Sequence, residues 1–175
     1  MPAQTGQFAV NVREWCERAQ GKADDILRAV SIEILNRVVI RSPVGNPELW
    51  AANKEATEKR RAALGMSRRA LEKAFPFKAG KGYTGGRFRG NWQVTLNAPA
   101  VGELDRIDPG GGATIADGSA AILPAKFGAS VFLVNNLPYA VRLEYGWSTQ
   151  APAGMVRITA AEFQGIVDDA TRAQP

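Results

Sequence analysis

Apolar residues recur at helical spacing over the first forty residues of the chain. Successive members of each group lie three or four residues apart: Phe8, Val12, Trp15 and Ala19 form one group, and Leu27, Val30, Ile34 and Val38 form the other. Such spacing places the side chains on one face of a helix. We therefore predict a long amphipathic helix over residues 8–41.

Three local features bear on where this helix begins, breaks and ends. Gly21 is a candidate kink, or a break between two helices, because glycine weakens a helix interior. Asp24 and Asp25 would suit the start of a second helix, where acidic groups are favoured. The helix should end at Ser42, since Pro43 disfavours helical geometry in the residue before it.

Alternating and continuous apolar patterns predict strands in the second half of the chain. Residues 91–97 (NWQVTLN) alternate, with Trp92, Val94 and Leu96 on one face. Residues 101–107 form a candidate short second strand. Residues 130–135 (SVFLVN) contain four consecutive apolar residues rich in β-formers and predict a buried strand.

The remaining patterned segments predict helices. We expect a short helix over residues 112–122, one or two helical turns over 138–144, a loop over 147–153 and a final helix over 153–173. This order predicts an α+β fold, a small antiparallel sheet packed against a long N-terminal helix and a C-terminal helix. We expect one domain over residues 1–175.

Residues 45–83 read as a helical and loop insertion in that domain. Within it, residues 54–73 are rich in Ala, Glu, Lys and Arg and carry little apolar surface. One interpretation is a solvated helix held by charge pairs four residues apart. The other is a basic arm that contacts a neighbouring subunit or DNA.

The composition of the chain excludes several kinds of catalytic and metal-binding site. The chain has one cysteine and no histidine among 175 residues, which excludes an internal disulfide, the usual zinc sites and every histidine-based nucleophile pair. We expect no enzyme activity, no cofactor and no metal. The net charge of +5 permits contact with nucleic acid or an acidic protein surface. No apolar run reaches membrane-spanning length, and the first residues lack a secretory pattern, so we expect folding in the cytoplasm.

Two motifs in the middle of the chain have a functional and a structural interpretation. Gly82, Gly85, Gly86 and Gly90 do not form a phosphate loop, because a strand rather than a helix follows them. The segment Arg87, Phe88, Arg89 with Trp92 offers cations and aromatic rings to nucleic acid. Alternatively, its aromatic residues belong to the core or an interface and its arginines are solvated or paired.

Two further side chains call for interpretation. Glu144 lies among aromatic residues and is either a catalytic acid or, as we favour, a hydrogen-bonding or ion-pairing group that fixes the loop after it. Cys16 beside Trp15 on a helix is typical of inert packing.

Three stretches together resemble a known family. They are residues 42–44 (SPV), residues 84–92 (TGGRFRGNW), and residues 135–140 (NNLPYA) followed by 143–146 (LEYG) and 150–156 (QAPAGMV). In this order they are similar to the tail-completion or neck proteins of tailed bacteriophages, the group typified by gene product 10 of phage HK97. The resemblance covers about residues 8–44 and 84–172 and does not include the charged segment 54–73.

The resemblance implies an α+β subunit of a ring, usually a hexamer, in the virion neck between the head connector or stopper and the tail tube or terminator. Packaged DNA is a further candidate contact. Such rings use heterologous interfaces, which favour aromatic and arginine anchors. The candidate interface residues are Arg87, Phe88, Arg89, Trp92, Tyr139, Glu144, Tyr145 and Trp147. Residues 79–86 would then be a loop that orders on docking.

Two alternatives remain beside this hypothesis. A tail terminator or a head–tail stopper would also be a small α+β ring subunit. A nucleic-acid-binding module would instead use the basic residues between 54 and 89.

Overall fold

The computed structural model describes residues 3–46, 48, 55, 58–59, 62–63, 65 and 84–174, with side chains from residue 8 onward. Apart from isolated positions, the predicted charged helix over 54–73 lies outside the described residues, as does most of the insertion over 45–83. One of the isolated positions, Lys59, pairs with Glu55 four residues earlier at 2.8 Å, which is the kind of pair that the composition suggested.

The structure is a small α+β fold, as predicted. Its elements in chain order are α1 (Ala3–Arg41), α4 (Arg87–Gly90), β1 (Trp92–Leu96), α5 (Gly112–Ile122), β2 (Val131–Asn135), α6 (Ala140–Glu144), α7 (Val156–Ala161) and α8 (Phe163–Arg172). The expected helices over 112–122 and 138–144 and the expected strands over 91–97 and 130–135 are thus confirmed within a few residues.

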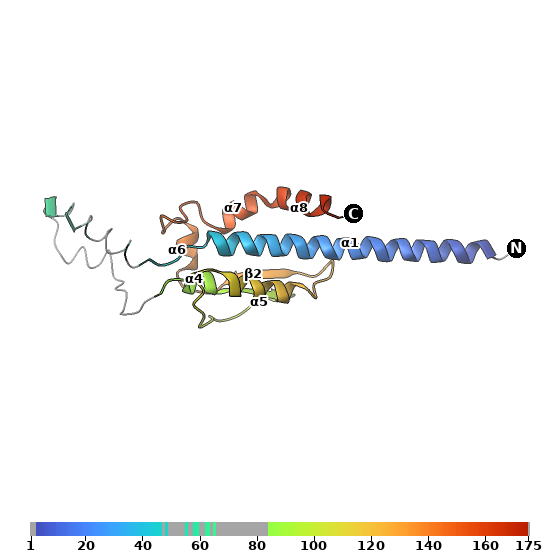
Figure 1. The fold of residues 1–175 in the computed structure, drawn as a ribbon, viewed down its shortest axis with the longest axis horizontal. Coiled ribbons are helices and arrows are strands. Elements are labelled where there is room, and N and C mark those ends of the chain that lie inside the picture. Colours follow the sequence, from blue (N-terminus) through green and yellow to red (C-terminus); the bar gives the residue numbers. More distant parts are fainter. Residues whose placement is uncertain are drawn as a thin grey trace.

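Helix α1 lies between two layers. In Figure 1, α7 and α8 follow one side of α1, while α5 and the sheet lie on the other side. The main core forms between α1, α5 and the sheet, where Leu35, Val39 and Ile122 are completely buried. Apolar side chains from three elements therefore meet at the C-terminal half of α1.

The sheet consists of β1 and β2 paired antiparallel, with Trp92 opposite Asn135 and Leu96 opposite Val131. This register places Val94 beside Leu133 on the face that packs against the core. The alternation seen in β1 was therefore assigned to the correct face. Strand β2 is half-buried along its length, and not fully buried as its continuous apolar run suggested.

The candidate second strand over residues 101–107 was wrong. Its polar backbone groups bond to side chains instead of to a neighbouring strand. Leu104 exchanges hydrogen bonds with the amide of Asn91, at 2.7 and 2.9 Å, and Gly102 accepts from Gln93 and Asn136, both at 2.9 Å. Because these side chains satisfy polar groups of the segment's backbone, the segment needs no strand partner and remains a loop.

Helix α1 runs through Gly21 without a break, and Asp24 and Asp25 lie in its middle and not at a helix start. A glycine there weakens the helix by only about 1 kcal/mol relative to alanine. Asp24 is buried and accepts the N–H of Phe127 at 2.6 Å and the ammonium of Lys126 at 3.1 Å. The acidic residue thus anchors the loop after α5, a role that depends on residues a hundred positions later.

The predicted final helix is divided in two. Glu162 lies between α7 and α8, and its carboxylate accepts hydrogen bonds from Arg37 and from Arg41 of α1. These two cations lower the pKa of Glu162. The apolar spacing was read correctly, but the anchor to α1 fixes a bend that the local pattern does not show.

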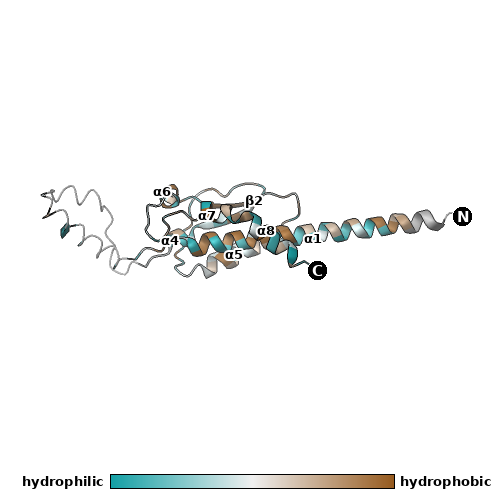
Figure 2. Cartoon of the chain, turned by 90° about the horizontal axis from the view of Figure 1, so that it is seen from above, coloured by the Kyte–Doolittle hydropathy of each residue, from teal (hydrophilic) through white to brown (hydrophobic). Residues whose placement is uncertain are grey.

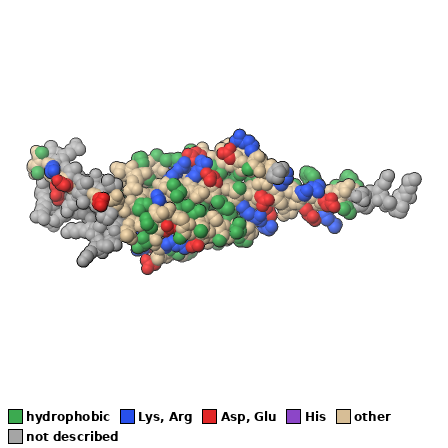
Figure 3. All heavy atoms as spheres, in the orientation of Figure 1, with side chains coloured by type: hydrophobic (Ala, Val, Ile, Leu, Met, Phe, Trp, Pro, Cys, Tyr) green, Lys and Arg blue, Asp and Glu red, His purple; other side chains and the backbone are tan. Residues whose placement is uncertain are grey.

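The two predicted apolar groups of α1 differ in how deeply their side chains are buried. Val30 and Val38 of the second group are buried. In contrast, every side chain from residue 8 to 22 is exposed, and Phe8 and Trp15 are 70% and 64% accessible. Figure 1 shows this half of α1 projecting beyond the body, Figure 2 shows hydrophobic segments along it, and Figure 3 shows hydrophobic side chains between charged ones at its surface.

Candidate functional site

The three segments that carry the sequence motif meet at the C-terminal end of α1. The indole N–H of Trp92 donates to the hydroxyl of Ser42 at 2.8 Å, and this hydroxyl donates to the carbonyl of Val38 at 2.6 Å. Trp92 and Ser42 are both buried. A polar chain thus joins the end of the helix to the start of β1 inside the core.

Arg89 closes the same end of α1. Its guanidinium donates to the carbonyls of Ile40, Ser42 and Pro109 at 2.7–2.9 Å. The last carbonyls of a helix lack partners within the helix, and a cation there also matches the negative end of the helix dipole. Burial lowers the pKa of Arg89, and the nearby carboxylate of Asp108 opposes this change.

The third segment of the motif, residues 135–156, packs against the same end of α1 through main-chain and side-chain contacts. We call the region where the three segments meet the corner. Gln150 accepts from the N–H of Val44 at 3.2 Å and donates to its carbonyl at 2.9 Å. Asn135 donates to the carbonyl of Phe88 at 2.9 Å. A second apolar cluster of Phe88, Leu137, Ala151 and Met155 fills the space between the segments.

One glycine of the motif is explained by close packing in this corner. Gly85 is buried, and a β-carbon on it would overlap the carbonyl oxygen of Gly45. The motif glycine therefore allows two backbone segments to touch, a requirement of packing and not of phosphate binding. Gly82 lies outside the described residues.

Glu144 caps helix α7, which confirms the favoured interpretation of this residue. Its carboxylate accepts the N–H groups of Met155, Val156 and Arg157 at 2.9–3.0 Å. Burial would raise the pKa of Glu144, but the hydrogen bonds from these three N–H groups outweigh it and the pKa lies below the ordinary value. The carboxylate is held ionised, whereas a general acid needs a raised pKa.

Asp108 has the same role at α5. It accepts the N–H of Gly111 and both the N–H and the hydroxyl of Thr114, each at 2.8 Å. Burial would raise its pKa, yet these bonds prevail and lower it. Both partly buried carboxylates thus stabilise helix starts.

An aromatic ridge lies on the surface of the corner, next to the Glu144 cap. We define the ridge as Tyr145 and Trp147, each 71% exposed. Arg157 lies over the ring of Tyr145 at 4.9 Å from its centre, and Arg142 lies over Trp147 at 5.7 Å. Large aromatic side chains with adjacent arginines are typical of protein interfaces.

Seven of the eight candidate interface residues therefore separate into two groups. Phe88 and Trp92 are buried and Arg89 is turned towards backbone carbonyls, so these three hold the corner together. Exposed residues form the second group: Tyr139, Tyr145, Trp147 and Arg87, of which Arg87 pairs with Glu103 at 3.0 Å. Glu144 supports this surface from beneath.

Sequence reasoning missed three residues of the site. Ser42 was taken as a helix end and as part of the motif stretch 42–44, but not as a hydrogen-bonding partner of Trp92, and Arg142 and Arg157 were not singled out. The spacing of the two arginines gives no signal, because only the turn over residues 145–154 brings them to the aromatic rings. The described residues contain no cluster of three His, Cys, Asp or Glu side chains that would hold a metal ion. Within the same residues no helix is long and apolar enough to cross a membrane.

No protein-family model, no curated protein and no solved structure matches this chain.

Proposed function

We propose that this chain is a non-enzymatic structural subunit of a tailed phage, a tail-completion or neck protein that forms a ring between the head connector and the tail tube. The observation that carries the proposal is the corner described above. The three segments that resemble the family pack against one another there, and they leave the ridge of Tyr145 and Trp147 exposed.

The chemistry of the ridge suits a contact with a protein. Two large rings bury much apolar area at little cost in conformational entropy, and the guanidinium of Arg142 beside Trp147 adds hydrogen-bond donors for a partner. The guanidinium of Arg157 instead donates to the main-chain carbonyl of Glu144 at 2.7 Å and so holds the turn beneath Tyr145. The Glu144 cap holds the loop that carries the ridge, so the surface is formed before a partner binds. In a ring, this patch would meet a different patch on the next subunit.

The position in the particle follows from the family resemblance. A tail terminator or a head–tail stopper would form a ring of the same kind. Location in the particle, and not fold, therefore distinguishes these alternatives from a tail-completion protein. Labelling the protein in intact particles would place it at the neck on this proposal. A label confined to the tail tip or the capsid shell would contradict it.

A nucleic-acid-binding module has no observation of its own in its favour. Arg87 pairs with Glu103, and Arg89 donates to main-chain carbonyls. The rest of the basic region over 54–83 lies outside the described residues except for isolated positions.

Assembly of the purified chain tests the proposal. Light scattering and electron microscopy should find ring-sized particles at high protein concentration. Trp147→Ala should leave the unfolding midpoint unchanged, because the side chain is exposed, and should weaken assembly at least tenfold. Phe127→Ala is the matched control, since Phe127 is 67% exposed but lies in the loop after α5.

Two results would overturn the proposal. One is a wild-type chain that stays monomeric at every concentration and in the presence of tail tubes. The other is particles that lack this protein and still carry joined, infectious tails. Equal assembly of Trp147→Ala and wild type would remove the ridge from the interface.

A further inference from the structure

Nearly every charged side chain in the body of the protein has a polar partner. We define the body as the described residues 24–46 and 84–174. Within these ranges Asp105 and Arg142 are the two charged side chains that make no hydrogen bond or ion pair, whereas the others are all bonded. Both are exposed. The body therefore presents one acid and one base whose bonding capacity is unused.

Asp105 lies between two exposed apolar side chains of the loop that joins β1 to α5. Val101 is 95% exposed and Ile107 is 58% exposed, and exposed residues alternate with half-buried ones over residues 103–108. We define the acidic patch as Val101, Asp105 and Ile107. An acid with apolar neighbours is the chemical counterpart of the ridge, where Arg142 lies over the ring of Trp147.

The loop that carries the acidic patch is held by amide side chains of the sheet region. Asn91 exchanges hydrogen bonds with the main chain of Leu104, the residue before Asp105, at 2.7 and 2.9 Å. Asn136 donates to the carbonyls on both sides of Val101, each at 2.9 Å. The acidic patch is thus formed before a partner binds, as the ridge is, and binding need not order the loop.

The ridge and the acidic patch lie on opposite sides of α1. In Figure 1 the loop between α6 and α7, which carries the ridge, lies on the side of α7 and α8. The loop between β1 and α5 lies on the other side, with α5 and the sheet. Two patches placed in this way cannot meet within one copy. They can meet between successive copies, as the heterologous contact of a ring requires.

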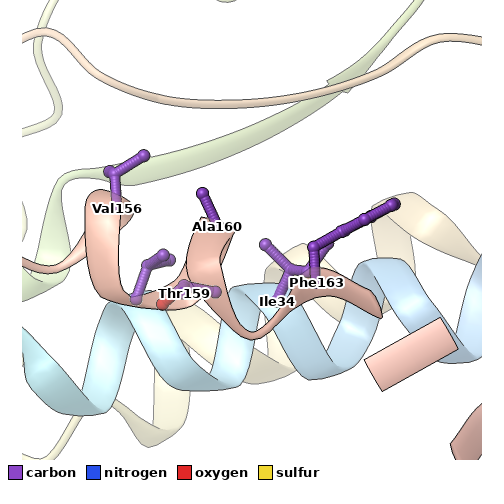
Figure 4. Close-up of a pocket in the computed structure, with 6 residues that line it drawn as sticks. Ile34, Val156, Thr159, Ala160 and Phe163 are labelled. Carbon is purple, nitrogen blue, oxygen red and sulfur yellow. The ribbon is translucent and has the colours of Figure 1, made fainter. Parts of the chain in front are cut away.

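A groove of ≈ 280 Å³ between α1, α7 and α8 is a less suitable acceptor for the ridge. Figure 4 shows Val156 and Ala160 of α7 and Phe163 of α8 above Ile34 of α1. None of the described residues that line this groove carries a carboxylate for Arg142. The groove is also on the same side of α1 as the ridge, so it does not supply the second patch of a heterologous contact.

We propose that the ridge of one copy docks on the acidic patch of the next copy. Arg142 donates to the carboxylate of Asp105 in this contact, and the aromatic rings of the ridge cover the apolar side chains of the patch. The inference rests on the proposed ring and names the surface that the ridge meets there. Each copy then uses both of its unpartnered charges, one with each neighbour.

Charge reversal tests the two residues separately. Asp105→Arg and Arg142→Asp should each weaken the subunit contact about tenfold or more, because each places like charges opposite one another. Sedimentation velocity over a range of protein concentrations measures the contact. Both variants should unfold at a midpoint close to that of wild type, since neither side chain has a hydrogen bond or ion pair in the body.

The control is Asp169→Arg, which makes the same change in net charge as Asp105→Arg. Asp169 is on α8, where it forms an exposed pair with Arg172, and exposed pairs of this kind contribute little to stability. This variant should assemble like wild type.

Rescue tests whether the two residues face each other. The double variant Asp105→Arg with Arg142→Asp exchanges the charges and should recover the assembly of wild type. An equimolar mixture of the two single variants should also associate, with the variants in alternation, because each arginine then faces an aspartate of its neighbour. A purely structural role of either residue predicts no recovery in the double variant or in the mixture.

The outcomes separate this inference from the proposed function. Assembly of both single variants like wild type would overturn the inference and leave the ring. Weakened single variants without recovery in the double variant and the mixture would also overturn it. Normal self-assembly of Arg142→Asp with loss of binding to tail tubes would assign the ridge to a different protein. A wild-type chain that stays monomeric with and without tail tubes would overturn the inference and the proposed function together.

Discussion

The indole N–H of Trp92 and the hydroxyl of Ser42 lie 2.8 Å apart across 50 residues of sequence. This bond joins the end of α1 to the start of β1, and both side chains are buried. The hydroxyl of Ser42 also donates a hydrogen bond to the carbonyl of Val38. The corner that supports the ridge therefore depends on one hydroxyl that is both donor and acceptor.

Ser42→Ala should destabilise the protein by about 1–3 kcal/mol, because it leaves the buried indole N–H without an acceptor. Urea unfolding at neutral pH measures the change. Ser130→Ala is the control, since Ser130 is exposed at the start of β2 and its loss should change stability by less than about 0.5 kcal/mol. Equal effects of the two substitutions would show that the Trp92–Ser42 bond contributes nothing.

Glu144→Gln should lower stability at neutral pH by about 1–2 kcal/mol, because an amide replaces a charged cap that accepts three N–H groups. Urea unfolding at pH 7 gives the value. Glu17→Gln, on the exposed projecting half of α1, is the control and should have little effect.

The effect of Glu144 should depend on pH. Its folded-state pKa lies below the ordinary value of 4.5, so its ionised form stabilises the fold above that value. This stabilisation should be lost as the pH falls through the lowered pKa. The difference between wild type and Glu144→Gln should therefore shrink on acidification below about pH 4. A constant difference from pH 7 to pH 3 would contradict the cap.

Gly154→Ala should destabilise the protein more than Gly128→Ala. Both glycines have positive φ, +84° and +93°, which costs a residue with a β-carbon about 1–2 kcal/mol. At Gly128 the new carbon meets nothing within 4 Å, whereas at Gly154 it overlaps the main-chain and side-chain oxygens of Glu144. Thermal unfolding compares the two, and equal midpoints would show that the turn yields without disturbing the cap.

Sequence patterns were sufficient where a segment's structure depends on its own residues. Ser42 and Pro43 ended α1 where expected, and the β-formers of 130–135 and the alternation of 91–97 predicted both strands to within a residue at each end. The role of Glu144 was also accessible, since a carboxylate among aromatic residues needs partners for its charge. These features follow from backbone preferences and from the cost of burying a polar group.

Contacts between distant segments decided the rest. Asn91 and Gln93 turned the expected strand over 101–107 into a loop, and Arg37 and Arg41 set the bend at Glu162. Such partners lie tens of residues away, so no local window contains them. The burial of Phe88 and Trp92 was one of the two interpretations that the sequence left open, and contacts between distant segments decided in its favour.

Helix α1 shows most clearly which features the sequence determined and which features the tertiary structure decided. By itself, the sequence determined that residues 8–19 and 27–38 each form an apolar face at helical spacing, because periodicity sets which side chains share a face. Only the tertiary structure decided that α5, α8 and the sheet cover the second face and leave the first exposed. The physical reason is that burial requires an opposing surface, and that surface is built from residues far along the chain.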